Sequence, residues 1–402
     1  MGHTVYEVPR NPASSLPNAA ERDDTFDTAF QLGWDHAQYA LTPPLEQLCI
    51  NPRLQQGFRA GRAAFGRRSL LPTAAVRQWL QLRLAALAQG RTYESVVLTP
   101  HFLAQIKVPL CPVTRERLGA ESGAVITRLR PDAGYAAGHL VLLGSRAHAA
   151  KAELGFADAL DRMQQCDAAR NGPARIDGLT GEQWARLAVL CSFVVPLPHE
   201  AAASLPLRVL PPNRLRLFNP AQALQVSIAR ALAHETPNKR LAAIRAALPG
   251  TPHRDAFDGV LEAYRAALTE AVQARPGVTP HWAVEDAWAD RLLQTRWKRF
   301  ARALTPEQCE AAAIDVAEGE ARRLPDVRAT EGWALATGGL LPHTLAARTA
   351  RFKKAVAVSG TPRSVPARAG RISHWPEPSY SAATRPAAAS PQAALFPTSS
   401  VG

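Results

Sequence analysis

The stretch from Cys111 to Lys151 constrains the fold of this chain more than any other segment. A short apolar run at Val125-Ile126 and a second run from Leu140 to Leu143 each predict a β-strand. Between them, the sequence Arg130-Pro131-Asp132-Ala133 is typical of a tight turn, because proline fixes φ at the second position of such turns. Gly134 follows at a point where left-handed backbone geometry is expected. The segment therefore predicts a β-hairpin.

A helix is expected directly after this hairpin. Gly144-Ser145 interrupts the second apolar run, and Ser145 is a favourable N-cap for a helix that begins at Arg146. The order strand, strand, helix defines a ββα unit, which we place within residues 109–152. Cys111 is expected to lie near the open end of the hairpin.

The ββα unit resembles the HNH endonuclease module, in the form common among phage and bacterial proteins. In that form an early Cys-Pro pair, an Asp-Arg on the first strand, a Gly-Tyr turn, an Asn entering the second strand and a Lys-bearing helix recur in order. The matching positions here are Cys111-Pro112, Thr127-Arg128, Gly134-Tyr135, Gly138-His139 and Ala147-His148 through Lys151. The resemblance covers roughly a tenth of the chain and implies a protein that acts on or binds nucleic acid.

The resemblance also implies roles for individual side chains. His139 and His148 are the candidate catalytic residues, and His148 is the candidate ligand of a divalent metal ion. Thr127 stands where the family has a carboxylate or a histidine, and a neutral hydroxyl is a poor substitute as a ligand for a hard cation. The candidate nucleic-acid-binding residues are Arg128, Arg130, Arg146 and Lys151.

Three functions are compatible with this pattern. The leading interpretation is a nucleic-acid-interacting protein whose degenerate HNH-like unit binds DNA or RNA with little or no cleavage. One alternative is a metal-dependent HNH-type endonuclease that uses His139 and His148. Another is a helical protein-interaction scaffold in which the hairpin is purely structural. The sequence specifies neither the metal, the choice between DNA and RNA, nor the oligomeric state.

The charge of the chain favours a polyanionic partner. The formal net charge is +13, from 47 basic and 34 acidic residues, and only six of the basic residues are lysines. From Arg351 onward there are seven basic residues and one acidic residue, which gives +6 and therefore nearly half of the excess. We expect this C-terminal tail to add non-specific affinity for phosphate groups.

Two further observations restrict the class of protein. No apolar run approaches the roughly 20 residues of a membrane span, and the N-terminus lacks a signal-peptide core, so we expect a cytoplasmic protein without membrane contact. The five cysteines are far apart and none forms a Cys-x-x-Cys pair. This spacing argues against a disulfide framework or a four-cysteine zinc site and favours buried free thiols.

The remaining sequence predicts a mostly α-helical protein, with bundle-like helical blocks on both sides of the ββα unit. The expected order is a flexible leader (1–22), an N-terminal helical block (23–108), the ββα unit (109–152), a C-terminal helical domain (153–345) and a basic disordered tail (346–402). In the N-terminal block, helices are expected from about Asp24, over Leu54–Phe65, over Thr73–Ala88 and after Thr99-Pro100.

Capping residues mark the expected helix starts in the C-terminal domain. Thr180 and Thr305 each precede Gln at the spacing of a capping box. Asn219-Pro220 likewise predicts a helix start. Apolar periodicity predicts one long amphipathic helix from Pro280 to Leu304.

Overall fold

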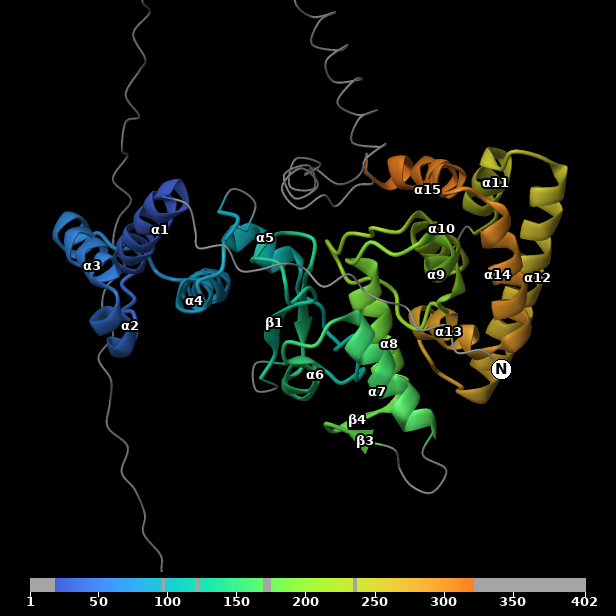
Figure 1. Ribbon diagram of the computed structural model, residues 1–402, viewed down its shortest axis with the longest axis horizontal. Helices are drawn as coiled ribbons and strands as arrows, with labels where there is room; N and C mark the ends of the chain where they lie inside the picture. The colour runs from blue at the N-terminus through green and yellow to red at the C-terminus, as the bar shows by residue number, and fades with distance from the viewer. Residues whose placement is uncertain (1–18, 96–97, 120–122, 169–174, 234–236, 322–402) are drawn as a thin grey trace, which may run out of the picture. The chain divides into compact units, whose positions relative to one another are not determined.

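The computed structural model describes residues 19–95, 98–119, 123–168, 175–233 and 237–321 of the 402-residue chain. Most of these residues lie in helices, which confirms the predicted mostly α-helical fold (Figure 1). The predicted tail, 346–402, lies outside the described residues, and so do residues 1–18 of the predicted leader. Among the helices of the described segments, none has the length and apolar character that a membrane crossing requires.

Before the ββα unit the described chain is helical, with short connections. Its helices are α1 (Ala19–Gln38), α2 (Leu45–Ile50), α3 (Pro52–Phe65), α4 (Ala74–Ala88) and α5 (Pro100–Gln105). The helices predicted over 54–65, over 73–88 and after Thr99 are confirmed as α3, α4 and α5. Thr73 and Thr99 cap α4 and α5 through their side chains. Helix α1 begins at Ala19, earlier than the expected Asp24, and α2 was not predicted.

Helices α1 and α3 pack with their backbones in contact. Gly33 of α1 faces the Leu54 carbonyl group of α3, and Gly57 of α3 faces the Phe30 carbonyl group of α1. A Cβ atom at either glycine would overlap the opposing backbone. Gly61, one turn further along α3, also faces α1. The glycines therefore allow a helix crossing that larger side chains would hold apart.

The predicted ββα unit is present. Strand β1 (Val125–Arg128) pairs antiparallel with β2 (Leu140–Leu143), and helix α6 (Ser145–Lys151) follows directly. The Gly144 amide donates a hydrogen bond to the Cys111 sulfur at 3.5 Å, just after β2 ends. This contact confirms that Cys111 lies at the open end of the hairpin.

Two details of the predicted unit were wrong. Ser145 is the first residue of α6, and the N-cap is Gly144, which offers no side-chain hydrogen bond. The expected tight turn at 130–133 is a series of bends within a longer loop, residues 129–139. The loop is drawn out because Tyr135 pairs with an earlier segment: its amide donates to the Thr92 carbonyl at 2.8 Å, and its carbonyl accepts from the Glu94 amide at 2.9 Å.

Gly134 is required in this loop for a different reason from the one expected. The left-handed glycine is Gly138, with φ of 97°, whereas Gly134 has a negative φ. A Cβ atom at Gly134 would overlap the Thr92 side chain. Gly134 therefore provides space for the pairing of Tyr135 rather than conformational freedom.

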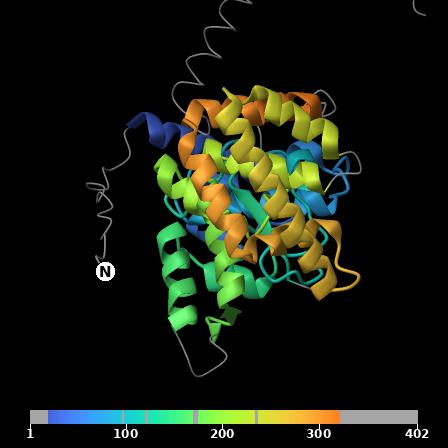
Figure 2. The ribbon, with the colours of Figure 1, turned by 90° about the vertical axis from the view of Figure 1, so that its right-hand side faces the viewer.

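The C-terminal domain consists of helices and one very short hairpin. Its elements are α7 (Phe156–Ala168), β3 (Arg175–Ile176), β4 (Leu179–Thr180), α8 (Gly181–Phe193), α9 (His199–Ser204), α10 (Pro220–Leu232), α11 (Pro237–Ala247), α12 (Thr251–Ala274), α13 (Pro280–Asp286), the 3₁₀ turn η1 (Ala287–Ala289), α14 (Arg291–Ala303) and α15 (Pro306–Ala321). Helix α7 packs on α8, α10 on α15, and α12 on α14. Figure 2 shows α12 and α14 side by side.

The capping residues predicted for this domain are present at some helix starts and not at others. The capping box of Thr180 is present, and Thr305 and Gln308 form the same reciprocal pair of bonds. Asn219 precedes α10 but makes no cap; its side chain donates instead to the Ser192 carbonyl, in the interior. The long helix predicted over 280–304 is divided into α13, η1 and α14 because Asp290 is extended and caps α14 by accepting from the Leu293 amide at 2.6 Å.

The described residues form two hydrophobic cores. The larger core combines side chains of the ββα unit with those of the C-terminal helices, including the buried Trp184, Trp288 and Trp297. The smaller core lies among the N-terminal helices, around Leu32 and Leu54. Helix α4 contributes to both cores: Val76 and Leu80 to the smaller one, Leu82 and Ala86 to the larger one.

The cysteines are free thiols, as expected. Cys111, Cys166, Cys191 and Cys309 are buried, whereas Cys49, at the end of α2, is exposed. The expectation of burial was therefore wrong for Cys49, because the helix on which it lies packs at the edge of the smaller core.

Candidate nucleic-acid interface

His139, a predicted catalytic residue, lies in the interior of the ββα unit. It is fully buried before β2, and its Nε2 atom lies 2.8 Å from the Gly134 carbonyl oxygen. Because a carbonyl oxygen only accepts, Nε2 carries a proton and donates this bond. Burial lowers the pKa of His139 to about 4. The imidazole is therefore neutral at neutral pH, and it stabilises the loop instead of facing a substrate.

His148, the second predicted catalytic residue and the predicted metal ligand, projects from α6 towards β1. Its Nδ1 atom lies 2.8 Å from the Thr127 hydroxyl oxygen. Burial lowers the pKa of His148, and the nearby charge of Lys151 lowers it further. The pair offers one imidazole and one neutral hydroxyl. Among the described residues, no group of three or more His, Cys, Asp or Glu side chains is placed to hold a metal ion.

Arg128, a predicted nucleic-acid-binding residue, is buried and is held by other parts of the protein. Its guanidinium donates to the Ala133 carbonyl at 2.7 Å and to the Glu153 carboxylate at 3.2 Å. It also lies over the Tyr135 ring, with its central carbon 4.9 Å from the ring centroid. Arg128 therefore ties β1, the long loop and the turn after α6 together, and its donors are occupied within the protein.

The other three predicted nucleic-acid-binding residues also have partners within the protein. Lys151 is buried, and its Nζ atom donates to the Leu154 carbonyl at 2.9 Å; burial lowers the pKa of this amine. Arg130 and Arg146 are nearer the surface, where Arg130 pairs with Asp132 at 2.8 Å and Arg146 pairs with Glu116. Helix α6 directs the Lys151 side chain inward, away from solvent. Neither surface arginine is an uncompensated charge.

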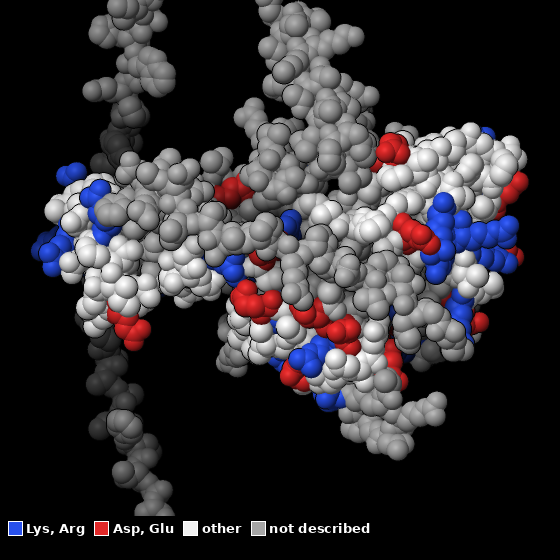
Figure 3. All heavy atoms as spheres, in the orientation of Figure 1, with Lys and Arg blue, Asp and Glu red and all other residues white. Residues whose placement is uncertain are grey.

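A different set of arginines, in the N-terminal helical block, lacks such partners. We call this set the basic face, and its members are exposed residues on α3, on α4 and just after each helix: Arg59, Arg62, Arg67, Arg68, Arg77 and Arg91. Within the described part of the chain, none of these six guanidinium groups has an acidic partner. In Figure 3 this block shows basic side chains with far fewer acidic ones. The basic face is therefore a concentration of uncompensated positive charge.

An arginine with an acidic partner lies in the interior of this block. Arg83 of α4 is buried and forms an ion pair with Asp35 of α1. Its guanidinium also lies 4.5 Å from the centroid of the Trp79 ring. This pair fixes α4 against α1.

The sequence contains a signal for the basic face that motif analysis missed. Between Glu46 and Glu94 there is no acidic residue, and this interval holds eight arginines. A count of net charge over the whole chain averages this interval with more acidic segments. A count within each predicted element would have found it.

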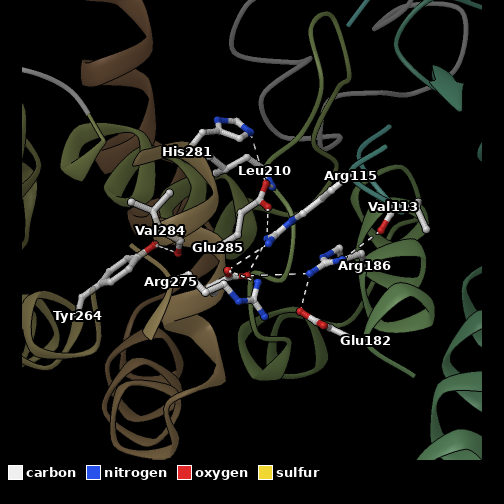
Figure 4. Close-up of polar contacts among 11 residues, drawn as sticks. Val113, Arg115, Glu182, Arg186, Leu210, Tyr264, Arg275, His281, Val284 and Glu285 are labelled. Carbon is white, nitrogen blue, oxygen red and sulfur yellow. Dashed lines mark hydrogen bonds and ion pairs between the residues drawn. The ribbon is translucent and has the colours of Figure 1, made fainter. Parts of the chain in front are cut away.

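A third feature is an ionic network between the ββα unit and α13 (Figure 4). Arg115, which precedes β1, donates to Glu285 at 2.8 Å and to Asp286 at 2.7 Å. Glu285 is buried and also accepts a hydrogen bond from the Leu210 amide at 2.8 Å. Burial raises the pKa of Glu285 to about 7, although Arg115 and the Leu210 amide oppose the shift. Arg186 of α8 lies 4.0 Å from Asp286 at the edge of the network.

Comparison with protein-family models, characterised proteins and solved structures finds no match to this chain. Its function is therefore argued from the residues and their placement.

Proposed function

We propose that this protein binds nucleic acid through the basic face of its N-terminal helical block. The observation that carries the proposal is the set of six exposed arginines without acidic partners in the described residues. Phosphodiester backbones are dense lines of negative charge, and arginine binds phosphate oxygens through two parallel N–H donors. Binding of this kind positions a protein on nucleic acid without selecting a sequence.

The helices that carry the arginines form a rigid support. The glycine-mediated contact of α1 with α3 and the buried pair of Arg83 with Asp35 fix the arrangement of α1, α3 and α4. The arginine side chains remain flexible, whereas the backbone that carries them is already ordered before binding. This arrangement lowers the entropy that is lost when several phosphates are bound at once.

We further propose that the HNH-like ββα unit does not cut phosphodiester bonds. Hydrolysis would need a metal ion and a base that reach the same phosphate. His139 is buried and already donates to Gly134, and Thr127 provides no carboxylate beside His148. Arg128 and Lys151, which were expected to bind phosphate, instead bond to the unit's own loop and to the turn between α6 and α7. The metal-dependent endonuclease is the less favoured alternative.

The test uses three fluorescein-labelled probes: a DNA duplex, the matching DNA single strand and the matching RNA strand. Fluorescence anisotropy measures the binding of each probe over a range of salt concentrations. The full chain is compared with the variant Arg62→Gln/Arg67→Gln/Arg68→Gln. We expect the wild type to bind, and the variant to bind at least tenfold more weakly at low salt. The slope of log affinity against log salt should fall by about three phosphate contacts, roughly 0.9 each for duplex DNA.

The matched control removes three exposed basic groups from the C-terminal domain: Arg265→Gln, Lys298→Gln and Arg299→Gln. It loses the same formal charge and retains the same C-terminal tail. Unchanged binding by the first triple variant, or an equal loss in both, would show that the basic face does not form the interface.

Exposed apolar side chains in the same block favour a second candidate, a protein-interaction scaffold. Leu45, Ile50, Leu70 and Leu71 are 76%, 75%, 50% and 94% exposed, respectively. Large apolar side chains at such exposure mark protein contacts more often than nucleic-acid contacts. Replacing Leu70 and Leu71 with Ser separates the two functions, because nucleic-acid binding should be retained while a protein contact would be lost.

A further inference from the structure

A cleft with largely apolar walls lies where the ββα unit meets the C-terminal helices. It has a volume of about 1020 Å³, and small-molecule sites usually occupy roughly 300–1,000 Å³. Its apolar lining comes from the segment before β1, from the loop 210–214 and from α13: Val108, Pro109, Leu110, Pro112, Leu210, Pro211, Pro212 and Trp282. The cleft can therefore hold a small molecule with an apolar body.

Trp282 of α13 gives the cleft an aromatic wall, and its side chain is partly exposed. The Arg115 guanidinium lies over the indole ring, with its central carbon 5.1 Å from the ring centroid. Arg115 is itself held by Glu285 at 2.8 Å and by Asp286 at 2.7 Å (Figure 4). The orientation of the ring is therefore fixed before a ligand binds, and a fixed ring can stack on a planar aromatic ligand.

Arg214 supplies a charge at the same cleft. Its side chain is only partly exposed, and among the described residues its guanidinium has neither a hydrogen-bond acceptor nor an acidic partner. Arg230 and Arg240 also line the cleft, but both have further partners within the protein, so neither is a free charge. A single free guanidinium suits a monoanion, and a carboxylate matches its two parallel N–H donors.

Glu285 and His281 add little charge to the lining. The Glu285 carboxylate is buried and already accepts hydrogen bonds from Arg115 and the Leu210 amide. The Nε2 atom of His281 lies 3.4 Å from this carboxylate, and burial lowers the pKa of the imidazole. Arg214 therefore remains the charge that the described lining offers to a ligand.

The conformation of Arg214 also indicates a role for its side chain. Arg214 has φ of 63°, a left-handed geometry that glycine adopts freely and that arginine rarely adopts. Contacts on both sides enforce it: Arg230 donates to the Pro211 carbonyl at 3.2 Å, and the Leu215 amide donates to the Pro212 carbonyl at 3.2 Å. Backbone strain of this kind concentrates at ligand sites.

We infer that this cleft binds a small aromatic carboxylic acid, with its carboxylate paired to Arg214, its ring stacked on Trp282 and its apolar body against the proline-rich walls. Arg115 and Glu285 act as positioning residues, because they hold the indole ring and the start of the loop rather than the ligand. The inference does not depend on the proposed role of the basic face.

The experiment is isothermal titration of the full chain with three probes. Naphthaleneacetate has both the aromatic ring and the carboxylate, naphthaleneethanol lacks the charge, and cyclohexaneacetate lacks the aromatic ring. We expect saturable binding of naphthaleneacetate. Naphthaleneethanol should bind about tenfold more weakly or worse, because the charge-assisted hydrogen bonds to Arg214 are lost. Cyclohexaneacetate should also bind more weakly, because it cannot stack on Trp282.

Two variants assign these losses to their residues. Arg214→Gly should weaken binding of naphthaleneacetate by about tenfold or more and leave that of naphthaleneethanol nearly unchanged. Because glycine accepts a φ of 63° without strain, the melting temperature of this variant should be unchanged or raised. Trp282→Leu should weaken binding of naphthaleneacetate and leave that of cyclohexaneacetate nearly unchanged. Arg299→Gln, an exposed residue outside the cleft, is the control and should bind as the wild type does.

Three results would overturn the inference. The first is the absence of saturable binding of naphthaleneacetate to the folded wild type at millimolar concentration. The second is equal affinity for naphthaleneacetate and naphthaleneethanol, which would remove the role of Arg214. The third is loss of binding by Arg214→Gly together with a lower melting temperature, since Arg214 would then support the loop rather than the ligand. Far-ultraviolet circular dichroism confirms that each variant is folded.

Discussion

The Nδ1 atom of His148 lies 2.8 Å from the Thr127 hydroxyl oxygen, so that α6 and β1 meet at these two side chains. The contact joins an imidazole to a neutral group. We therefore expect the purified chain to leave duplex and single-stranded DNA intact in the presence of magnesium, manganese or zinc. Gel electrophoresis after prolonged incubation measures this. Cleavage that His148→Ala abolishes would instead support the endonuclease.

Replacing Arg128 should lower stability and spare nucleic-acid binding. Arg128→Met leaves two carbonyl groups and the Glu153 carboxylate without their donor. Breaking a buried pair of this kind costs about 3–5 kcal/mol, but Glu153 is 67% exposed and can be solvated, so we expect a value below that range. Urea denaturation measures the loss, and anisotropy at a temperature where the variant is folded should give wild-type affinity. Weaker binding by folded Arg128→Met would support the predicted role of Arg128 in nucleic-acid binding.

The crossing of α1 and α3 should not tolerate a methyl group. Gly57→Ala places a Cβ atom against the Phe30 carbonyl, where backbone must move, and we expect a loss of about 1–3 kcal/mol or more in the free energy of unfolding. Gly259→Ala is the matched control, because Gly259 lies within α12 and has nothing within 4 Å of an added Cβ. That control should be neutral or stabilising by up to about 1 kcal/mol. Equal effects of the two substitutions would contradict the close crossing.

Glu285 should make stability depend on pH. Its pKa is about 7 in the folded protein, above the ordinary 4.5, so the folded state binds more protons than the unfolded state between these values. The free energy of unfolding should therefore fall as pH rises from about 4.5 to 7, with a slope of at most about 1.4 kcal/mol per pH unit from this group. His281, whose lowered pKa gives an opposite slope below about 6.5, partly offsets it.

The variant Glu285→Gln separates these contributions. It should show a smaller decrease in stability over this pH interval, measured by urea denaturation at several pH values. Glu262→Gln, whose side chain is 76% exposed in its pair with Arg296, is the control and should retain the wild-type profile. A pH profile of Glu285→Gln identical to that of the wild type would contradict the raised pKa.

Local signals in the sequence predicted the elements well and their boundaries less well. Thr73, Thr99 and Thr180 mark helix starts because a capping bond spans only three residues and depends on nothing distant. The break within 280–304 could not be predicted because the apolar periodicity continues across Asp290, even though the Asp290 side chain caps a new helix. The long loop of the hairpin could not be predicted because its hydrogen-bond partner, Thr92, is remote in sequence.

The roles of the candidate site residues could not be predicted in the same way. Arg128, His139 and Lys151 are polar residues that a motif places at a site, but whether each points to solvent or to the interior depends on packing against Glu153, Gly134 and Leu154. No local pattern encodes those contacts. The basic face was more accessible to prediction, because the absence of acidic residues between Glu46 and Glu94 is a property of the sequence alone.

Helix α4 belongs to both hydrophobic cores, since Val76 and Leu80 pack in one and Leu82 and Ala86 in the other. The N-terminal helices therefore cannot open fully as an independent unit without removing α4 from the larger core as well. Local opening free energies should reflect this: amides of α4 should exchange with solvent as slowly as those of the buried α8, whereas α2, which has no buried residue, should exchange fastest. A protein that carries its basic face on α3 and α4 would then lose that surface only when the fold as a whole is lost.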